Sequence, residues 1–311
     1  MKYINEFRDA ELGKSLIARI RQRSTKPARL MEFCGGHTVS IAKHGIRQLL
    51  PPTITMLSGP GCPVCIVPAA EIDEAIGLAL EKNVTITTFG DLIRVPASHM
   101  SLQDAKANGG DIRVVYSVTD AVKMASKEPN RDFAFFAVGF ETTAPSTALE
   151  ILKPPSNLSF LVSHRLIPPA MELLLGVGDL HIDGFIAPGH VSTIIGMKPY
   201  EMFPRAYRMP TVVAGFELLD VLFAISILLQ QIKNKEAKLE NEYSRVVAWE
   251  GNVKAQKLIA EAFDIIDGNW RGLGKIPASA LALKKDYGEY DARRKYDVKI
   301  ENSRDLLPGC H

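Results

Sequence analysis

The sequence predicts an α/β protein made of two similar lobes, each with a mostly parallel sheet flanked by helices, followed by a mainly helical C-terminal segment. Short runs rich in β-branched residues alternate with longer helical patterns, as is typical of a parallel sheet covered by helices. Most of these runs end in a loop that contains glycine and a polar or reactive residue. The sequence VGFETTAP at 138–145 is echoed by AGFELLD at 214–220, which favours two related halves.

The predicted strands form two sets around residues 118–131. The first set covers 28–33, 53–57, 85–89 and 113–117, and the second covers 133–138, 158–163, 184–187 and 211–214. Between strands lie helical patterns such as 68–83, where apolar side chains recur at positions i, i+3 and i+4. We therefore expect a first α/β lobe at 1–120 with the CGGH and GPGCPVC loops, a second at 121–235 with the GFETT and PGHVS loops, and a mainly helical region at 236–311.

Composition and charge exclude several classes of protein. The formal net charge of +2 over 311 residues leaves no basic surplus for nucleic acid, so we expect no nucleic-acid partner. The longest apolar segment, 221–229, is far shorter than the roughly 20 residues of a membrane span. The N-terminal residues lack the pattern of a signal peptide, and we expect a cytoplasmic protein without a membrane partner. In that reducing compartment its four cysteines are more typical of metal binding or catalysis than of disulfides.

The sequence GPGCPVC at 59–65 places Cys62 and Cys65 between a predicted strand and a predicted helix. At the N-terminus of a helix, free backbone N–H groups and the macrodipole favour a thiolate, which is the nucleophilic and metal-binding form of cysteine. The alternative is a pair of small buried residues in a proline-rich turn. A C-x-x-C motif after a strand favours a reactive pair.

The sequence FCGGHT at 33–38 brings Cys34 and His37 to the end of another predicted strand. Gly35 and Gly36 allow a ligand to come close to the backbone there, although a buried cysteine with a capping histidine is the alternative. Together with the C-x-x-C pair, these residues supply three thiolates and an imidazole, a set that can bind zinc tetrahedrally. A thiolate metal site is the leading interpretation and a dithiol redox pair the second, and spacing alone does not separate them.

Three further polar residues follow predicted strands: Asp91 in FGDLIRVP, Glu141 in GFETT and His190 in PGHVS. Taken singly, such residues are more often helix caps or ion-pair partners than catalysts. As a group at strand ends, they are candidates to line a functional cleft.

The ordered motifs FCGGHT, GPGCPVC, TFGDLIRVP, VGFETTAP, SHRLIPPAM, APGHVSTIIG, GFELLD and WRGLGKIP resemble the HypD family of hydrogenase maturation proteins, from about residue 8 to the final LPGCH. The resemblance implies a scaffold that assembles the Fe(CN)2CO group of [NiFe]-hydrogenases with the chaperone HypC and receives cyanide from HypE. It implies that Cys34 binds iron, with His37 beside it in the cofactor site, and that Cys62 and Cys65 are a thiol pair in the same cleft. Asp91, Glu141 and His190 would orient ligands or move protons.

The same resemblance implies a C-terminal [4Fe-4S] cluster held by four cysteines. Cys310 matches the first of them, and it stands next to the last residue of this sequence. One thiolate does not hold a cluster that takes four, so we expect iron binding at Cys34 and no complete cluster site within these residues. The alternative function is a stand-alone thiol-disulfide oxidoreductase that uses Cys62 and Cys65, and a structural zinc module is a third interpretation.

Overall fold

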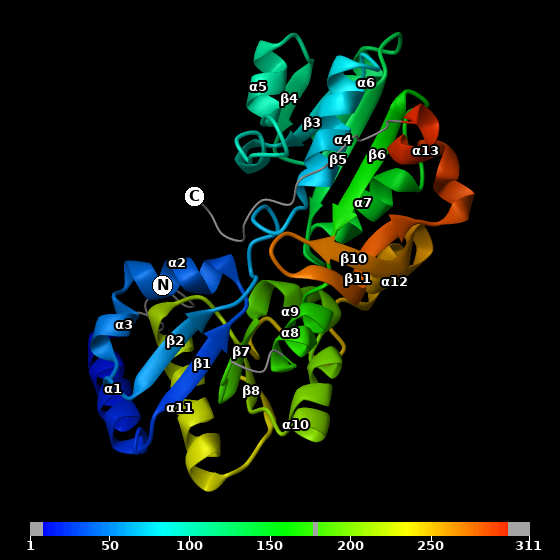
Figure 1. Ribbon diagram of the computed structural model, residues 1–311. Coiled ribbons are helices and arrows are strands. Elements are labelled where there is room, and N and C mark those ends of the chain that lie inside the picture. Colours follow the sequence, from blue (N-terminus) through cyan, green and yellow to red (C-terminus); the bar gives the residue numbers. More distant parts are fainter. Residues whose placement is uncertain (1–8, 177–179, 298–311) are drawn as a thin grey trace. The chain divides into compact units, whose positions relative to one another are not determined.

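The structure is a computed structural model, and it describes residues 9–176 and 180–297 (Figure 1). Its contacts divide the chain into two compact units. The first unit comprises the chain up to Cys62 together with Ala170–Val253, and the second comprises Pro63–Pro169 and the chain from Lys254 onward.

The first unit is built on a parallel sheet with strand order β2-β1-β7-β8-β9. Its strands are β1 (Ala28–Glu32), β2 (Ile54–Ser58), β7 (Gly184–Pro188), β8 (Thr211–Ala214) and β9 (Leu239–Asn241). Its helices are α1 (Ala10–Arg23), α2 (Gly35–Lys43), α3 (Ile46–Leu49), α9 (Gly189–Ile195), α10 (Met202–Tyr207) and α11 (Leu218–Asn234), with the 3-10 turn η3 (Lys198–Tyr200).

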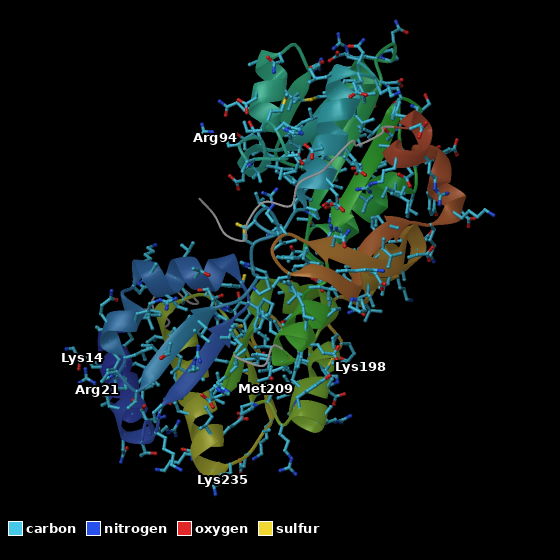
Figure 2. All side chains as sticks on the ribbon, in the orientation of Figure 1. Lys14, Arg21, Arg94, Lys198, Met209 and Lys235 are labelled. Atoms are coloured by element: carbon cyan, nitrogen blue, oxygen red, sulfur yellow. The ribbon has the colours of Figure 1, made fainter. Side chains whose placement is uncertain are left out.

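Helices α1 and α11 cover one face of this sheet and close its core. Leu16 and Ile20 of α1 pack with Leu222 and Ile225 of α11, and all four are at most 1% exposed. Lys14 and Arg21 of α1, and Lys235 directly after α11, are exposed and lie on the outside, as Figure 2 shows. Within the described residues, no helix combines the length and the apolar character needed to cross a membrane.

The second unit is built on a parallel sheet with strand order β4-β3-β5-β6. Its strands are β3 (Thr85–Phe89), β4 (Ile112–Val115), β5 (Phe133–Gly139) and β6 (Leu158–His164). Its helices are α4 (Ala69–Leu80), α5 (Leu102–Ala107), α6 (Val118–Lys127), α7 (Ala144–Ile151), α12 (Val253–Ala262) and α13 (Ala292–Tyr296), with the 3-10 turns η2 (Gly90–Leu92) and η4 (Lys285–Tyr290), while α8 (Ile167–Leu175) begins in this unit. Every residue of β5 and β6 is buried, as expected of strands covered on both faces.

Both sheets have the same strand order once their strands are numbered along the chain within each unit. In each, the second strand lies at one edge, the first strand follows it, and the third and fourth come next. The two-lobed α/β prediction is therefore confirmed. The GFE echo does not mark equivalent positions, however, because β5 is the third strand of its sheet and β8 the fourth of the other.

The expected division into the contiguous ranges 1–120, 121–235 and 236–311 differs from the observed one. Strands β7 and β8 pair beside β1, whereas β5 and β6 complete the other sheet, so the range 121–235 contributes to both units. Hydrogen bonds between parallel strands, which sequence order does not dictate, decide this division.

The described part of the C-terminal region is mixed rather than mainly helical. It contains an antiparallel pair, β10 (Phe263–Trp270) and β11 (Gly274–Leu283), beside α12 and α13. The pair was not predicted because β10 shows no alternation of buried and exposed residues: its stretch from Asp264 to Asp267 is exposed throughout. Such a strand lacks the period of two by which sequence patterns indicate strands.

Candidate functional site

Cys34 lies where β1 ends and α2 begins. It is the N-cap residue of α2, and its carbonyl oxygen accepts hydrogen bonds from the amides of His37 (2.8 Å) and Thr38 (3.1 Å). Its thiol is free and half-buried. In a sheet of this order, the end of the first strand next to the third is the point where chain connections diverge to opposite faces, which is where α/β proteins bind ligands.

Close approach of two loops fixes the backbone of Cys34. The amide of Gly35 donates to the carbonyl oxygen of Gly61 at 3.1 Å. A Cβ atom on Gly61 would stand 2.5 Å from the Cys34 nitrogen and 2.7 Å from its Cα. Only glycine at position 61 allows this approach, so the loop before the C-x-x-C motif is part of the Cys34 site.

Glu32, which the sequence analysis did not single out, supports the same turn. Its side chain is 0% exposed and accepts hydrogen bonds from the Cys34 amide (2.9 Å) and the Thr38 hydroxyl (2.5 Å). Burial raises the pKa of Glu32, although these hydrogen bonds oppose the shift. The signal that could have identified Glu32 in the sequence is an acidic residue inside the mainly apolar run ARLMEF.

The surroundings of Cys34 favour the neutral thiol. Burial is the main cause that raises its pKa, and the nearby Glu32 carboxylate adds to the shift. Backbone hydrogen bonds from Gly36 and His37 act in the opposite direction. The site therefore stabilises the thiolate only when a cation replaces the proton.

His37 is completely buried and has a defined tautomer. Its Nε2 atom lies 2.9 Å from the carbonyl oxygen of Gly215 and 3.2 Å from that of Ala214. Because carbonyl oxygens only accept hydrogen bonds, Nε2 carries the proton and Nδ1 keeps its lone pair. Nδ1 is buried and has no hydrogen-bond partner in the described part of the chain. Burial lowers the pKa of His37 to about 4, so the ring is neutral.

Phe216 connects His37 with His190. Its ring stacks on His37 at 4.6 Å between centroids and on His190 at 3.8 Å. A Cβ atom on Gly36 would stand 2.9 Å from the Phe216 ring, so this glycine makes room for the stack rather than for a ligand. His190 is exposed and follows β7, the neighbour of β1. The first unit therefore places Cys34, His37 and His190 just after the carboxyl ends of the neighbouring strands β1 and β7.

Cys62 and Cys65 are half-buried and stand on either side of the division between the two units, which falls after Cys62. The segment after Cys65 is anchored in the second unit by buried Arg271, whose backbone amide donates to the Ile66 carbonyl (2.8 Å) and whose Nε donates to the Val67 carbonyl (2.7 Å). Helix α4 begins only at Ala69. The helix predicted at 68–83 is therefore confirmed. The C-x-x-C pair lies four and seven residues before its first residue, beyond the reach of the macrodipole, whose effect is confined to the first turn.

Asp91 and Glu141 belong to the second unit. Asp91 follows β3 and Glu141 follows β5, the first and third strands of the second sheet. In the first sheet, Cys34 and His190 follow the first and third strands in the same way. Asp91 is exposed. Glu141 is 3% exposed, its Oε1 accepts from the Ile167 amide at 2.9 Å, and burial raises its pKa to about 7.

The predicted site residues therefore divide between the two units, with Cys65, Asp91 and Glu141 in the second. Cys310 lies outside the described residues. Across residues 9–176 and 180–297, no group of three or more His, Cys, Asp or Glu side chains is arranged to hold a metal ion.

Comparison with known proteins identifies the family. A family model named HypD, described as the hydrogenase formation hypA family, matches residues 11–311. Hydrogenase maturation factor HypD2 of Bradyrhizobium diazoefficiens is 45% identical over 100% of this chain and 85% of its own length. Hydrogenase maturation factor HypD of Cupriavidus necator is 46% identical over 96% and 83%, and that of Rhizobium leguminosarum bv. viciae is 46% identical over 100% and 84%. The chain belongs to the HypD family of hydrogenase maturation factors.

Proposed function

We propose that this protein is a scaffold on which the Fe(CN)2CO group of [NiFe]-hydrogenases is assembled, and that Cys34 holds the iron. The observation that carries the proposal is the position of Cys34: a free, half-buried thiol at the switch point of the first sheet, with its backbone locked by Gly61. The iron is the cargo of this scaffold, bound for the hydrogenase.

The chemistry of the site suits such iron. Cyanide and carbon monoxide hold Fe(II) in a low-spin state, and a soft thiolate is a fitting protein ligand for it. Burial of Cys34 lowers the local dielectric and limits competition from water. His37, three residues after Cys34, is neutral, and its buried Nδ1 keeps a lone pair.

The remaining iron ligands come, in this proposal, from outside the chain. A HypC-type chaperone supplies a second cysteine, and a HypE-type protein supplies cyanide. His190 is exposed at the same edge of the sheet, where it can donate or accept a proton as ligands arrive. Cys62 and Cys65 serve as the redox-active thiol pair.

A [4Fe-4S] cluster needs four thiolates. The sequence offers Cys310 alone in its last segment, and the other cysteines are Cys34, Cys62 and Cys65. These residues do not fit a cluster, so we derive no electron-transfer step through one.

The proposal is tested by infrared spectroscopy of the protein purified without oxygen together with a HypC-type chaperone. We expect cyanide and carbonyl stretching bands in the wild type and their loss in Cys34→Ala. Val39→Ala is the matched control, because Val39 lies on the same helix α2 with its side chain 65% exposed. Bands that survive Cys34→Ala would show that this thiol is not the iron ligand.

Metal analysis of the same samples separates the alternatives. Near-stoichiometric iron supports the scaffold. A metal-free protein with rapid disulfide turnover at Cys62 and Cys65 would instead establish the thiol-disulfide oxidoreductase, and tightly bound zinc would establish a structural zinc module.

A further inference from the structure

A pair of buried carboxyl groups lies behind His37 in the first unit. Asp220, in the first turn of α11, is 0% exposed, and the side chain of Glu242 is 10% exposed. Glu242 follows β9, and its amide donates to the Val213 carbonyl of β8 at 2.9 Å. The sheet itself therefore places Glu242 beside the segment Ala214–Gly215 that contacts His37.

One peptide group connects Glu242 with His37. The Gly215 amide donates to Glu242 Oε2 at 3.1 Å. The carbonyl of the same peptide group belongs to Ala214 and accepts from His37 Nε2 at 3.2 Å, and the next carbonyl, that of Gly215, accepts from the same atom at 2.9 Å. Hydrogen bonds in such a chain polarise one another, so a stronger acceptor at Glu242 makes the Ala214 carbonyl a stronger acceptor for His37.

The two carboxyl groups share one cation. Arg245 Nη2 contacts Asp220 Oδ2 at 2.5 Å, whereas its Nη1 lies 4.0 Å from Glu242 Oε1. Asp220 Oδ2 also accepts from the Glu217 amide, while buried Asp220 Oδ1 has no conventional hydrogen-bond partner among the described residues. The negative charge of Asp220 disfavours ionisation of Glu242 in this buried site.

The ionisation of Glu242 follows from these contacts. Burial, and next the charge of Asp220, raise the pKa of Glu242 to about 8. Glu242 therefore carries a proton at neutral pH and loses it as the pH rises through this value.

We infer that Glu242 acts as a positioning residue that sets the strength of the His37 hydrogen bonds through the Ala214–Gly215 peptide group, and that a proton on Glu242 weakens those bonds. Loss of that proton makes Glu242 a full anion and a better acceptor for the Gly215 amide. The His37 bond then strengthens, and its tautomer is held more firmly. Any effect of this coupling on iron chemistry rests on the proposed function. The coupling between Glu242 and His37 is independent of it.

The test follows the side-chain nitrogens of His37 by NMR in protein labelled with ¹⁵N-histidine and free of iron. The sequence has 7 histidines, and His37→Gln assigns the signal. We expect the Nε2–H resonance of the wild type to shift with a midpoint near pH 8, the pKa of Glu242. Glu242→Gln, which mimics the protonated carboxyl, should lack this step, and Asp220→Asn should move the midpoint to lower pH, because the Asp220 charge raises the pKa of Glu242.

Other groups near the pair titrate in different windows. Burial lowers the pKa of His190, burial raises the pKa of Tyr243 above its usual value of 10.0, and the pKa of His37 itself is about 4. Glu217 is the remaining acid that faces Tyr243, and Glu217→Gln should leave the step in place. Glu236→Gln is the control in the same unit, since Glu236 is exposed and pairs with Lys238.

A wild-type His37 signal without a step near pH 8 would overturn the inference, as would a step that persists in Glu242→Gln. Because no iron is present, either result leaves the infrared test of Cys34 unaffected. Conversely, loss of the iron proposal would leave the coupling between Glu242 and His37 intact. Near-ultraviolet circular dichroism verifies that each variant is folded.

Discussion

The two units share a strand order but carry different chemistry at the same place in that order. In the first unit, the switch point between the first and third strands holds Cys34 and the exposed His190. In the second unit, the same point holds exposed Asp91 and buried Glu141. One arrangement offers a soft donor and an imidazole, and the other offers carboxylates.

This difference shows that the strand order determines where a site can lie, whereas the loops supply its chemical groups. Gly61 packs so closely against the loop after β1 that position 61 has no room for a side chain. The loop after β5 instead buries an acid against the Ile167 amide at the start of α8. Three variants test whether the two positions differ in the way the structure indicates.

The largest effect is expected from Gly61→Ala in the first unit. The added Cβ would stand 2.5 Å from the backbone nitrogen of Cys34, and a backbone atom cannot move aside as a flexible side chain can. We expect a loss of about 4 kcal/mol in the free energy of unfolding, together with loss of the cyanide and carbonyl bands. Urea denaturation measures the first and infrared spectroscopy the second.

Gly35→Ala is the matched control. Its Cβ would meet nothing closer than the Gly61 carbonyl oxygen at 3.7 Å, an ordinary contact, and alanine is favoured over glycine in a helix such as α2. A Gly61→Ala protein as stable as Gly35→Ala would refute the packing argument.

The second effect concerns Glu141 and depends on pH. Its pKa rises from 4.5 to about 7 on folding, so between these values the folded state binds more protons than the unfolded state. Stability from this group is therefore fully present below about pH 4.5 and is lost as the pH rises through 7, by about 3 kcal/mol in total. Glu141→Gln should remove this dependence, as measured by urea denaturation across that range.

Glu289→Gln, an exposed substitution in the same unit, should leave the pH dependence unchanged. If wild type and Glu141→Gln lost stability in parallel from pH 4.5 to 7, the buried carboxyl would not be the group responsible.

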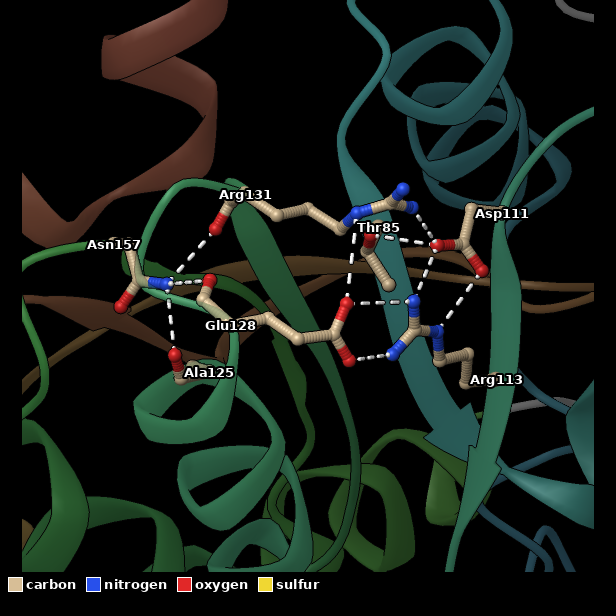
Figure 3. Close-up of polar contacts among 7 residues, drawn as sticks. All are labelled: Thr85, Asp111, Arg113, Ala125, Glu128, Arg131 and Asn157. Carbon is tan, nitrogen blue, oxygen red and sulfur yellow. Dashed lines mark hydrogen bonds and ion pairs between the residues drawn. The ribbon is translucent and has the colours of Figure 1, made fainter.

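The smallest effect is expected at the amino ends of the strands of the second sheet, opposite the carboxyl ends that precede Asp91 and Glu141. Figure 3 shows Arg113 and Arg131 reaching Asp111 and Glu128, and Arg113 contacts Asp111 at 2.8 Å and Glu128 at 2.5 Å. These side chains are partly exposed, so Arg113→Ala should cost only about 1 kcal/mol, and less in molar salt. Thermal unfolding at low and high salt measures both.

Lys14→Ala is the control for this network, because the pair of Lys14 with Glu11 is 73% and 82% exposed and should contribute almost nothing. Arg113→Ala should also leave the infrared bands of the Cys34 site unchanged. A loss of those bands would mean that the Arg113 network affects the Cys34 site as well as stability.

The sequence by itself determined much of the local structure. Strands such as 85–89 and 211–214 were predicted at their observed bounds, because both are short runs of β-branched and apolar residues followed directly by a glycine. The position of Cys34 at a strand end followed from the same pattern, and so did the family, which the ordered motifs carry.

Only the tertiary structure decided which strands share a sheet, and therefore that Cys34 and His190 follow neighbouring strands whereas Glu141 belongs to the other unit. It alone revealed Glu32, Phe216 and Glu242, whose contacts join segments as far apart in the chain as His37 and Phe216. Local propensity and periodicity depend on neighbours within a few residues, whereas hydrogen bonds between strands and the burial of charge depend on the whole packed unit. The sequence therefore specifies the strand and loop that carry the thiol, and the packing specifies the groups that surround it.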